Sequence, residues 1–101
     1  IASMSEEVKT DYTGLFVVHV HVREKVIPVV CGSSAPQRVR WLGHVGIARY
    51  DDTHFEGWKE LGAPTEIRKD GARGPLLPMD ETISNVIKSG DHVYVSSSLA
   101  T

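Results

Sequence analysis

The stretch LFVVHVHV at residues 15–22 is the most regular pattern in the chain, and the rest is interpreted outward from it. It is rich in β-branched residues, and in its second half polar residues alternate with valines, which is typical of a half-buried strand. Phe16, Val18, Val20 and Val22 share one face, because successive side chains of a strand point to opposite sides. We expect this face to meet the core.

A second apolar run, residues 26–31, follows the charged triplet 23–25, so the two runs form a predicted hairpin. Pro28 cannot donate a backbone hydrogen bond, which places it at a sheet edge or an unpaired position. Residues 34–37, Ser-Ala-Pro-Gln, then have the form of a capping box. A helix is therefore expected to begin there.

Val39, Leu42 and Val45 follow at helical spacing, and Gly43 and Gly46 weaken the pattern, so the predicted helix ends near residues 44–46. The remaining elements are expected to be a strand at 47–50, a loop at 51–57, a strand at 58–61, a loop over most of 62–78, a short helix at 80–90 and a last strand at 91–96. The predicted core consists of Phe16, Val18, Val20, Val22, Val39, Leu42, Trp58, Ile83, Ile87, Val93 and Val95.

Composition restricts the class of protein. The chain has 101 residues, of which 41% are hydrophobic and 24% charged, as expected for one globular domain. Its net charge is −2 at pH 7, which disfavours nucleic-acid binding, and no apolar run is long enough for a membrane span. The single cysteine, Cys31, cannot form an internal disulfide, which favours a reducing, cytoplasmic location.

The order of hairpin, helix, hairpin, loop with a short helix and final strand is that of the ubiquitin-like β-grasp, an α+β fold. We therefore expect a mixed four- to five-stranded sheet packed on one main helix and a short second helix, with the first and last strands side by side. The predicted domain covers residues 14–97. Residues 1–13 are expected to be a flexible tail, and residues 98–101 a tail or a linker to the rest of a larger protein.

Two segments carry a resemblance to known families: Arg49-Tyr50-Asp51 followed by Trp58-Lys59-Glu60-Leu61, and residues 83–97 with Gly90-Asp91-His92-Val93-Tyr94-Val95. This half of the chain resembles doublecortin-type ubiquitin-like domains. It is also similar to the N-terminal domain of the trypanosome flagellar-pocket-collar scaffold protein. The resemblance implies a terminal module of a cytoskeletal scaffold, associated with a cilium or flagellum. Doublecortin-type domains bind microtubules through basic surfaces, so the resemblance implies microtubule binding as an alternative function.

Candidate chemistry is sparse. His19 and His21 share a strand face, but no third ligand follows at a recognisable spacing, so no metal site is expected. Cys31 ends an apolar strand, where a small buried hydrophobic residue is expected rather than a nucleophile. We therefore predict no catalytic residue, no cofactor and a non-catalytic protein–protein interaction module.

The basic and the acidic side chains are concentrated in different segments of the chain. Residues 23–49 carry five basic side chains and one acidic one, whereas residues 51–66 carry one basic and five acidic. If these groups lie on separate faces, the domain associates with itself or with a related domain, as Phox/Bem-type domains do. The predicted partner-binding residues, which would attract an acidic or cytoskeletal protein, are Arg23, Lys25, Arg38, Arg40, Trp41 and Phe55.

Overall fold

The predicted hairpin is present in the computed structural model, which describes residues 15–99. Strands β1 (Val17–Val22) and β2 (Lys25–Val30) pair antiparallel across a two-residue turn. Arg23 takes a positive φ of 55° in this turn, the conformation that tight hairpin turns require. Pro28 of β2 lies opposite His19 of β1. Strand β2 is an edge strand, which is the position that the missing N–H of Pro28 predicts.

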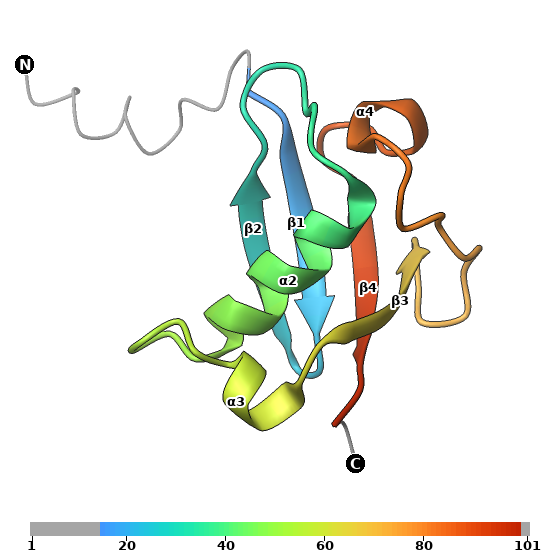
Figure 1. Ribbon diagram of the computed structural model, residues 1–101. Coiled ribbons are helices and arrows are strands. Elements are labelled where there is room, and N and C mark those ends of the chain that lie inside the picture. Colours follow the sequence, from blue (N-terminus) through green and yellow to red (C-terminus); the bar gives the residue numbers. More distant parts are fainter. Residues whose placement is uncertain (1–14, 100–101) are drawn as a thin grey trace, which may run out of the picture.

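The sheet is mixed and has four strands in the order β2-β1-β4-β3. Strand β4 (His92–Ser97) runs parallel to β1, and β3 (Pro64–Lys69) pairs antiparallel with β4 (Figure 1). The prediction that the first and last strands are neighbours is therefore confirmed, as is the α+β class.

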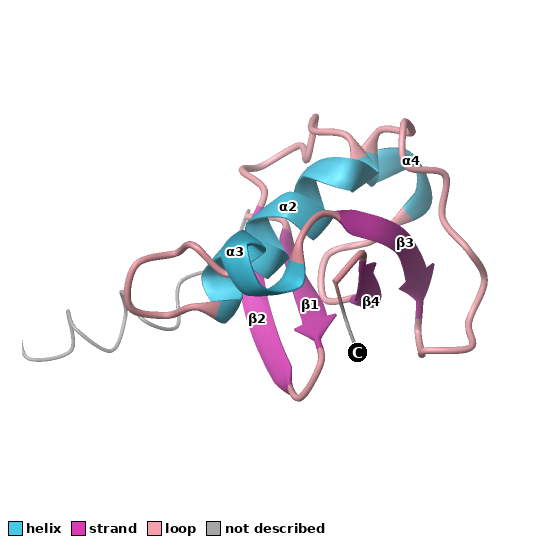
Figure 2. Cartoon of the chain, turned by 60° about the horizontal axis from the view of Figure 1, so that its bottom comes forward, coloured by secondary structure: helices cyan, strands magenta, loops and turns pink. Residues whose placement is uncertain are grey.

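Helix α2 (Val39–Tyr50) covers one face of this sheet through Val39, Leu42, Gly43, Gly46 and Ile47, which are all buried. Two single-turn helices, α3 (Trp58–Leu61) and α4 (Ile83–Val86), complete the helical layer. Figure 2 shows α2 lying over β1 and β2, with α3 beside α2. One sheet face thus meets the core, and within residues 15–99 no helix covers the other, which we call the open face.

Three predicted elements were wrong. Residues 47–50 form the last turn of α2 rather than a strand, because Ile47 continues the buried stripe of the helix. Residues 58–61 form α3 rather than a strand, since only Leu61 is buried and Trp58 points outward. The predicted loop over residues 62–78 contains β3, an edge strand with a single buried residue, Ile67.

The core prediction was largely confirmed. Eight predicted core residues are at most 2% exposed: Val18, Val20, Val22, Val39, Leu42, Ile83, Ile87 and Val93. Phe16 and Val95 are half-buried and pack against this core. Trp58 was wrongly placed in the core, because 51% of it is exposed. Val29, Leu61 and Ile67 are fully buried core residues that the pattern did not identify.

The hydrogen-bonded domain continues past residue 97. The Ser98 N–H donates to the Ala63 carbonyl oxygen at 2.9 Å, and the Leu99 N–H donates to that of Leu61, also at 2.9 Å. The tail predicted at residues 1–13 lies outside the described residues, as do residues 100 and 101. Within residues 15–99, no helix has both the length and the apolar character needed to cross a bilayer.

Candidate functional site

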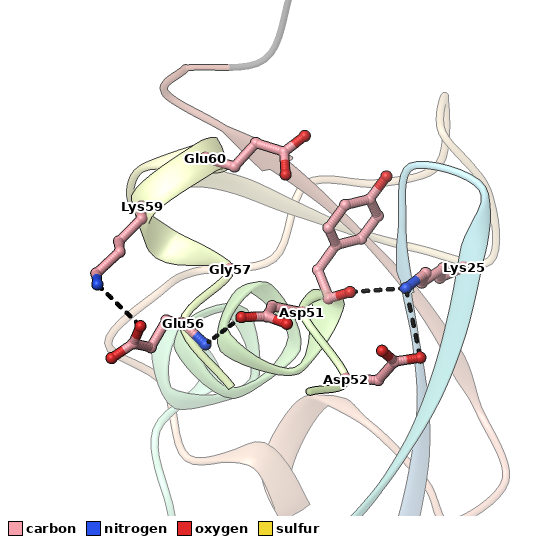
Figure 3. Close-up of a pocket in the computed structure, with 8 residues that line it drawn as sticks. Lys25, Asp51, Asp52, Glu56, Gly57, Lys59 and Glu60 are labelled. Carbon is pink, nitrogen blue, oxygen red and sulfur yellow. Dashed lines mark hydrogen bonds and ion pairs between the residues drawn. The ribbon is translucent and has the colours of Figure 1, made fainter. Parts of the chain in front are cut away.

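The loop that joins α2 to α3 forms, together with β2, an open pocket of about 390 Å³ (Figure 3). We call it the α2–α3 pocket. It is lined by Lys25, Tyr50, Asp51, Asp52, Glu56, Gly57, Lys59 and Glu60. Its four carboxylates outnumber its two lysines, so the pocket is acidic.

Asp51 holds the loop in place. Its Oδ1 accepts hydrogen bonds from the backbone N–H groups of Thr53 at 3.0 Å and His54 at 3.3 Å, and its Oδ2 accepts one from Glu56 at 3.3 Å. These bonds, that from Thr53 above all, lower the pKa of Asp51. The Gly57 N–H donates to the Ala48 carbonyl oxygen at 3.1 Å and ties the end of the loop to α2. The loop is thus built around one carboxylate.

Lys25 and Tyr50 join the hairpin to the end of α2. The Lys25 Nζ lies 4.8 Å from the centre of the Tyr50 ring, donates to the Tyr50 carbonyl oxygen at 2.7 Å, and pairs with the Asp52 Oδ2 at 3.9 Å. The Tyr50 hydroxyl donates to the Glu24 carboxylate at 2.9 Å. The Glu24 backbone N–H and, after it, this hydroxyl lower the pKa of Glu24, while the same carboxylate raises the pKa of Tyr50.

Two large aromatic side chains beside the pocket face solvent. Phe55 is 58% exposed and has a φ of 57°, and Trp58 is 51% exposed. The Lys59 Nζ lies 5.6 Å from the centre of the Trp58 ring and 2.9 Å from the Glu56 Oε1, whose hydrogen bond raises the pKa of Lys59. We call the α2–α3 pocket together with Phe55 and Trp58 the acidic–aromatic surface.

The predicted site residues do not form one cluster. Arg38 and Arg40 lie at the start of α2, about 18 Å from its end at 1.5 Å per residue. The Arg38 Nη1 donates to the Asp80 carbonyl oxygen at 2.9 Å, and Arg40 pairs with the Asp80 carboxylate. Trp41 is half-buried and packs against the core. These arginines therefore bridge α2 to the segment before α4.

Lys25 and Phe55, by contrast, lie at the acidic–aromatic surface. Arg23 lies in the β1–β2 turn and lines a second pocket on the open sheet face. Tyr50, Asp51 and Trp58 were not among the predicted partner-binding residues, although the acidic segment 51–60 was the alternative place for the interface. A usable signal was the Asp51-Asp52-Thr53 run directly after the helix, since Asp side chains often accept hydrogen bonds from N–H groups two residues further on.

Two observations concern other kinds of site, a nucleophilic cysteine and a metal centre. Cys31 is fully buried, and burial raises the pKa of its thiol to about 11, so it is protonated at neutral pH. Across residues 15–99, no three side chains of His, Cys, Asp and Glu are grouped so that they could hold a metal ion.

Comparisons with protein-family models, with curated proteins and with solved structures gave no significant match. The resemblance to doublecortin-type domains therefore stays a prediction.

Proposed function

We propose that this chain is a non-catalytic protein-interaction module with a ubiquitin-like β-grasp fold. The strand order β2-β1-β4-β3, with a parallel central pair and a helix that crosses one face, supports this fold. A place in a cytoplasmic, cytoskeletal scaffold stays a prediction from the resemblance. The alternative functions, Phox/Bem-type association and microtubule binding, need a continuous basic face, whereas the arginines and Lys25 lie at both ends of α2.

The observation that carries the proposal is the exposure of Phe55, on a loop whose backbone is already fixed, and of Trp58, at the start of α3. Exposed aromatic side chains are the residue type that contributes most to protein interfaces. A preorganised loop also loses little conformational freedom on binding. Asp51 preorganises the loop, because its carboxylate accepts three backbone hydrogen bonds.

The charge of the surface indicates the chemistry of the partner. Four carboxylates line the α2–α3 pocket, and its two lysines are already paired with Asp52 and Glu56. A partner segment that carries Lys or Arg fits this surface, since its cations meet carboxylates in the pocket and aromatic rings beside it.

A random-peptide display selection against the folded domain tests the proposal. We expect it to yield basic peptides whose affinity falls about tenfold or more in Phe55→Ala and in Trp58→Ala. Leu76→Ala is the matched control, because Leu76 is 53% exposed but lies outside the acidic–aromatic surface. A selection without binders, or binders that all three variants bind equally well, contradicts the proposal.

A further inference from the structure

The open face of the sheet carries four ring side chains in contact. The rings of His19 and His92 stack at a centroid distance of 4.6 Å, and those of His21 and Tyr94 stack at 4.0 Å. The His21 Nε2 lies 2.8 Å from the His92 Nδ1, which is a hydrogen bond between the two rings. This cluster connects β1 to β4 on the side away from α2.

A pocket of about 210 Å³ adjoins these rings. We call it the sheet-face pocket. It is lined by His21, Arg23, Arg68, Ala72, Tyr94, Val95 and Ser96, and thus by no carboxylate. The Arg68 guanidinium donates to the Gly74 carbonyl oxygen at 3.0 Å and to the Glu66 Oε1 at 3.4 Å, and within residues 15–99 no ion pair involves Arg23. Two guanidinium groups therefore line the pocket, and that of Arg68 is paired with Glu66.

We propose that the sheet-face pocket binds a carboxylate side chain of an acidic peptide segment from another protein, with Arg23 and Arg68 as donors. A planar guanidinium matches a carboxylate with two parallel hydrogen bonds, and the His21 and Tyr94 rings form an apolar wall for the methylene groups of the ligand. At about 30 Å³ per water, the pocket has room for several waters, which such a side chain displaces. This site goes beyond the proposed function, since it lies on a different surface and takes a ligand of opposite charge.

The ring cluster makes this binding dependent on pH. A hydrogen bond between two imidazoles requires one neutral ring, so protonation of both His21 and His92 breaks it and adds positive charge beside the pocket. Burial, followed by the charges of His92 and His19, lowers the pKa of His21.

Charged groups around the cluster act in both directions, because the Arg68 guanidinium disfavours an imidazolium and the Glu66 carboxylate favours it. Tyr94 and Arg68 face it from β4 and β3, together with the carboxylate of Glu66, whereas β2 places only Val26 and Pro28 opposite the histidines of β1. Because the pKa of His21 is lowered from 6.5, affinity for a carboxylate should increase as the pH falls below about 6.5 while staying above the Glu pKa of about 4.3.

The test measures the fluorescence anisotropy of a labelled hexaglutamate peptide titrated with the domain. We expect Arg23→Gln and Arg68→Gln each to weaken binding about tenfold, as for the loss of a hydrogen bond between charged groups. Arg49→Gln is the matched control, since it removes the same charge from an exposed position of α2, which covers the other face of the sheet. Glu66→Gln should strengthen binding, because it removes the carboxylate that competes for Arg68.

Amide chemical shifts in a two-dimensional NMR titration locate the peptide. Shifts confined to His21, Arg23, Arg68 and Tyr94 support the proposal, and shifts at residues 50–60 overturn it. It is also overturned if the peptide does not bind, if Arg49→Gln weakens binding as much as the pocket variants do, or if a single-stranded oligonucleotide binds the pocket more tightly. None of these results depends on Phe55 or Trp58, so failure here and failure of the proposed function can be distinguished.

Discussion

The contact between α2 and β1 at Gly46 allows a quantitative prediction. A Cβ at Gly46 would lie 2.6 Å from the Val20 Cγ1 and 3.1 Å from the Val22 Cγ2, whereas carbon atoms in contact ordinarily lie about 3.5–4.0 Å apart. Both valines are buried, and their β-branched side chains have few alternative rotamers. The added methyl group must therefore separate the helix from the sheet.

Two opposing effects decide the sign of Gly46→Ala. Alanine favours the helix by about 1 kcal/mol over glycine, and overpacking a core costs about 1–3 kcal/mol. Because the overlap with Val20 is close to 1 Å and the site is fully buried, we expect the upper end of that cost. The net loss in the free energy of unfolding is then about 2 kcal/mol, measured by urea denaturation followed by circular dichroism.

A double-mutant cycle isolates the contact. Val20→Ala alone removes two buried methyl groups and should cost about 2–3 kcal/mol. It also makes room for the new methyl group at Gly46, so the double variant should be more stable than the sum of the single effects by at least about 1 kcal/mol. His44→Ala, at an exposed position of α2, is the control and should add independently to Val20→Ala. Additive losses at Gly46 and Val20, or a stabilising Gly46→Ala, would refute the reasoning.

Two further predictions concern single ionisable groups. The folded pKa of Asp51 is lowered from 3.8, so its contribution to stability is present above about pH 4 and is lost as the pH falls through the folded value. The difference in unfolding free energy between the natural chain and Asp51→Ala should therefore shrink below that pH, and a difference that is constant down to full acid unfolding would contradict this. Cys31 is buried and its thiol pKa is about 11, so iodoacetamide at neutral pH should alkylate it only when the domain unfolds. Mass spectrometry of the folded domain checks this, and rapid alkylation without denaturant would show that the thiol is accessible.

The elements that could be predicted from the sequence are those with a strong period. Strands β1 and β4 both carry valines at alternate positions, and Val18, Val20 and Val22 of β1 are buried, so both strands and their adjacency were recovered. Helix α2 begins at Val39 rather than at the predicted capping box of residues 34–37, and its end was predicted too early because Gly43 and Gly46 were interpreted as helix breakers. Their actual role is close packing, since a Cβ at Gly43 would lie 2.6 Å from the Pro64 Cβ. Such contacts depend on the tertiary arrangement, which a local pattern does not contain.

The candidate site was predicted only in part, for a similar reason. Phe55 was identified as a possible anchor from its polar neighbours, and the structure places it at the surface. Trp58 was assigned to the core because residues 58–61 were interpreted as a strand, whereas they form the single-turn helix α3, in which only Leu61 is buried. The basic and acidic parts of the chain were identified from the sequence, but their ion pairs were not. Arg40, for example, pairs with Asp80, a residue forty positions away.

The parallel pairing of β1 with β4 has a mechanical consequence. Because these strands run in the same direction, the start of β1 and the end of β4 lie at opposite ends of the sheet (Figure 1). Tension applied between those two points acts along the strands and loads all the hydrogen bonds between them in shear at once. A pull across the β1–β2 hairpin would instead break its bonds one after another. The domain is therefore built to resist stretching along its strands.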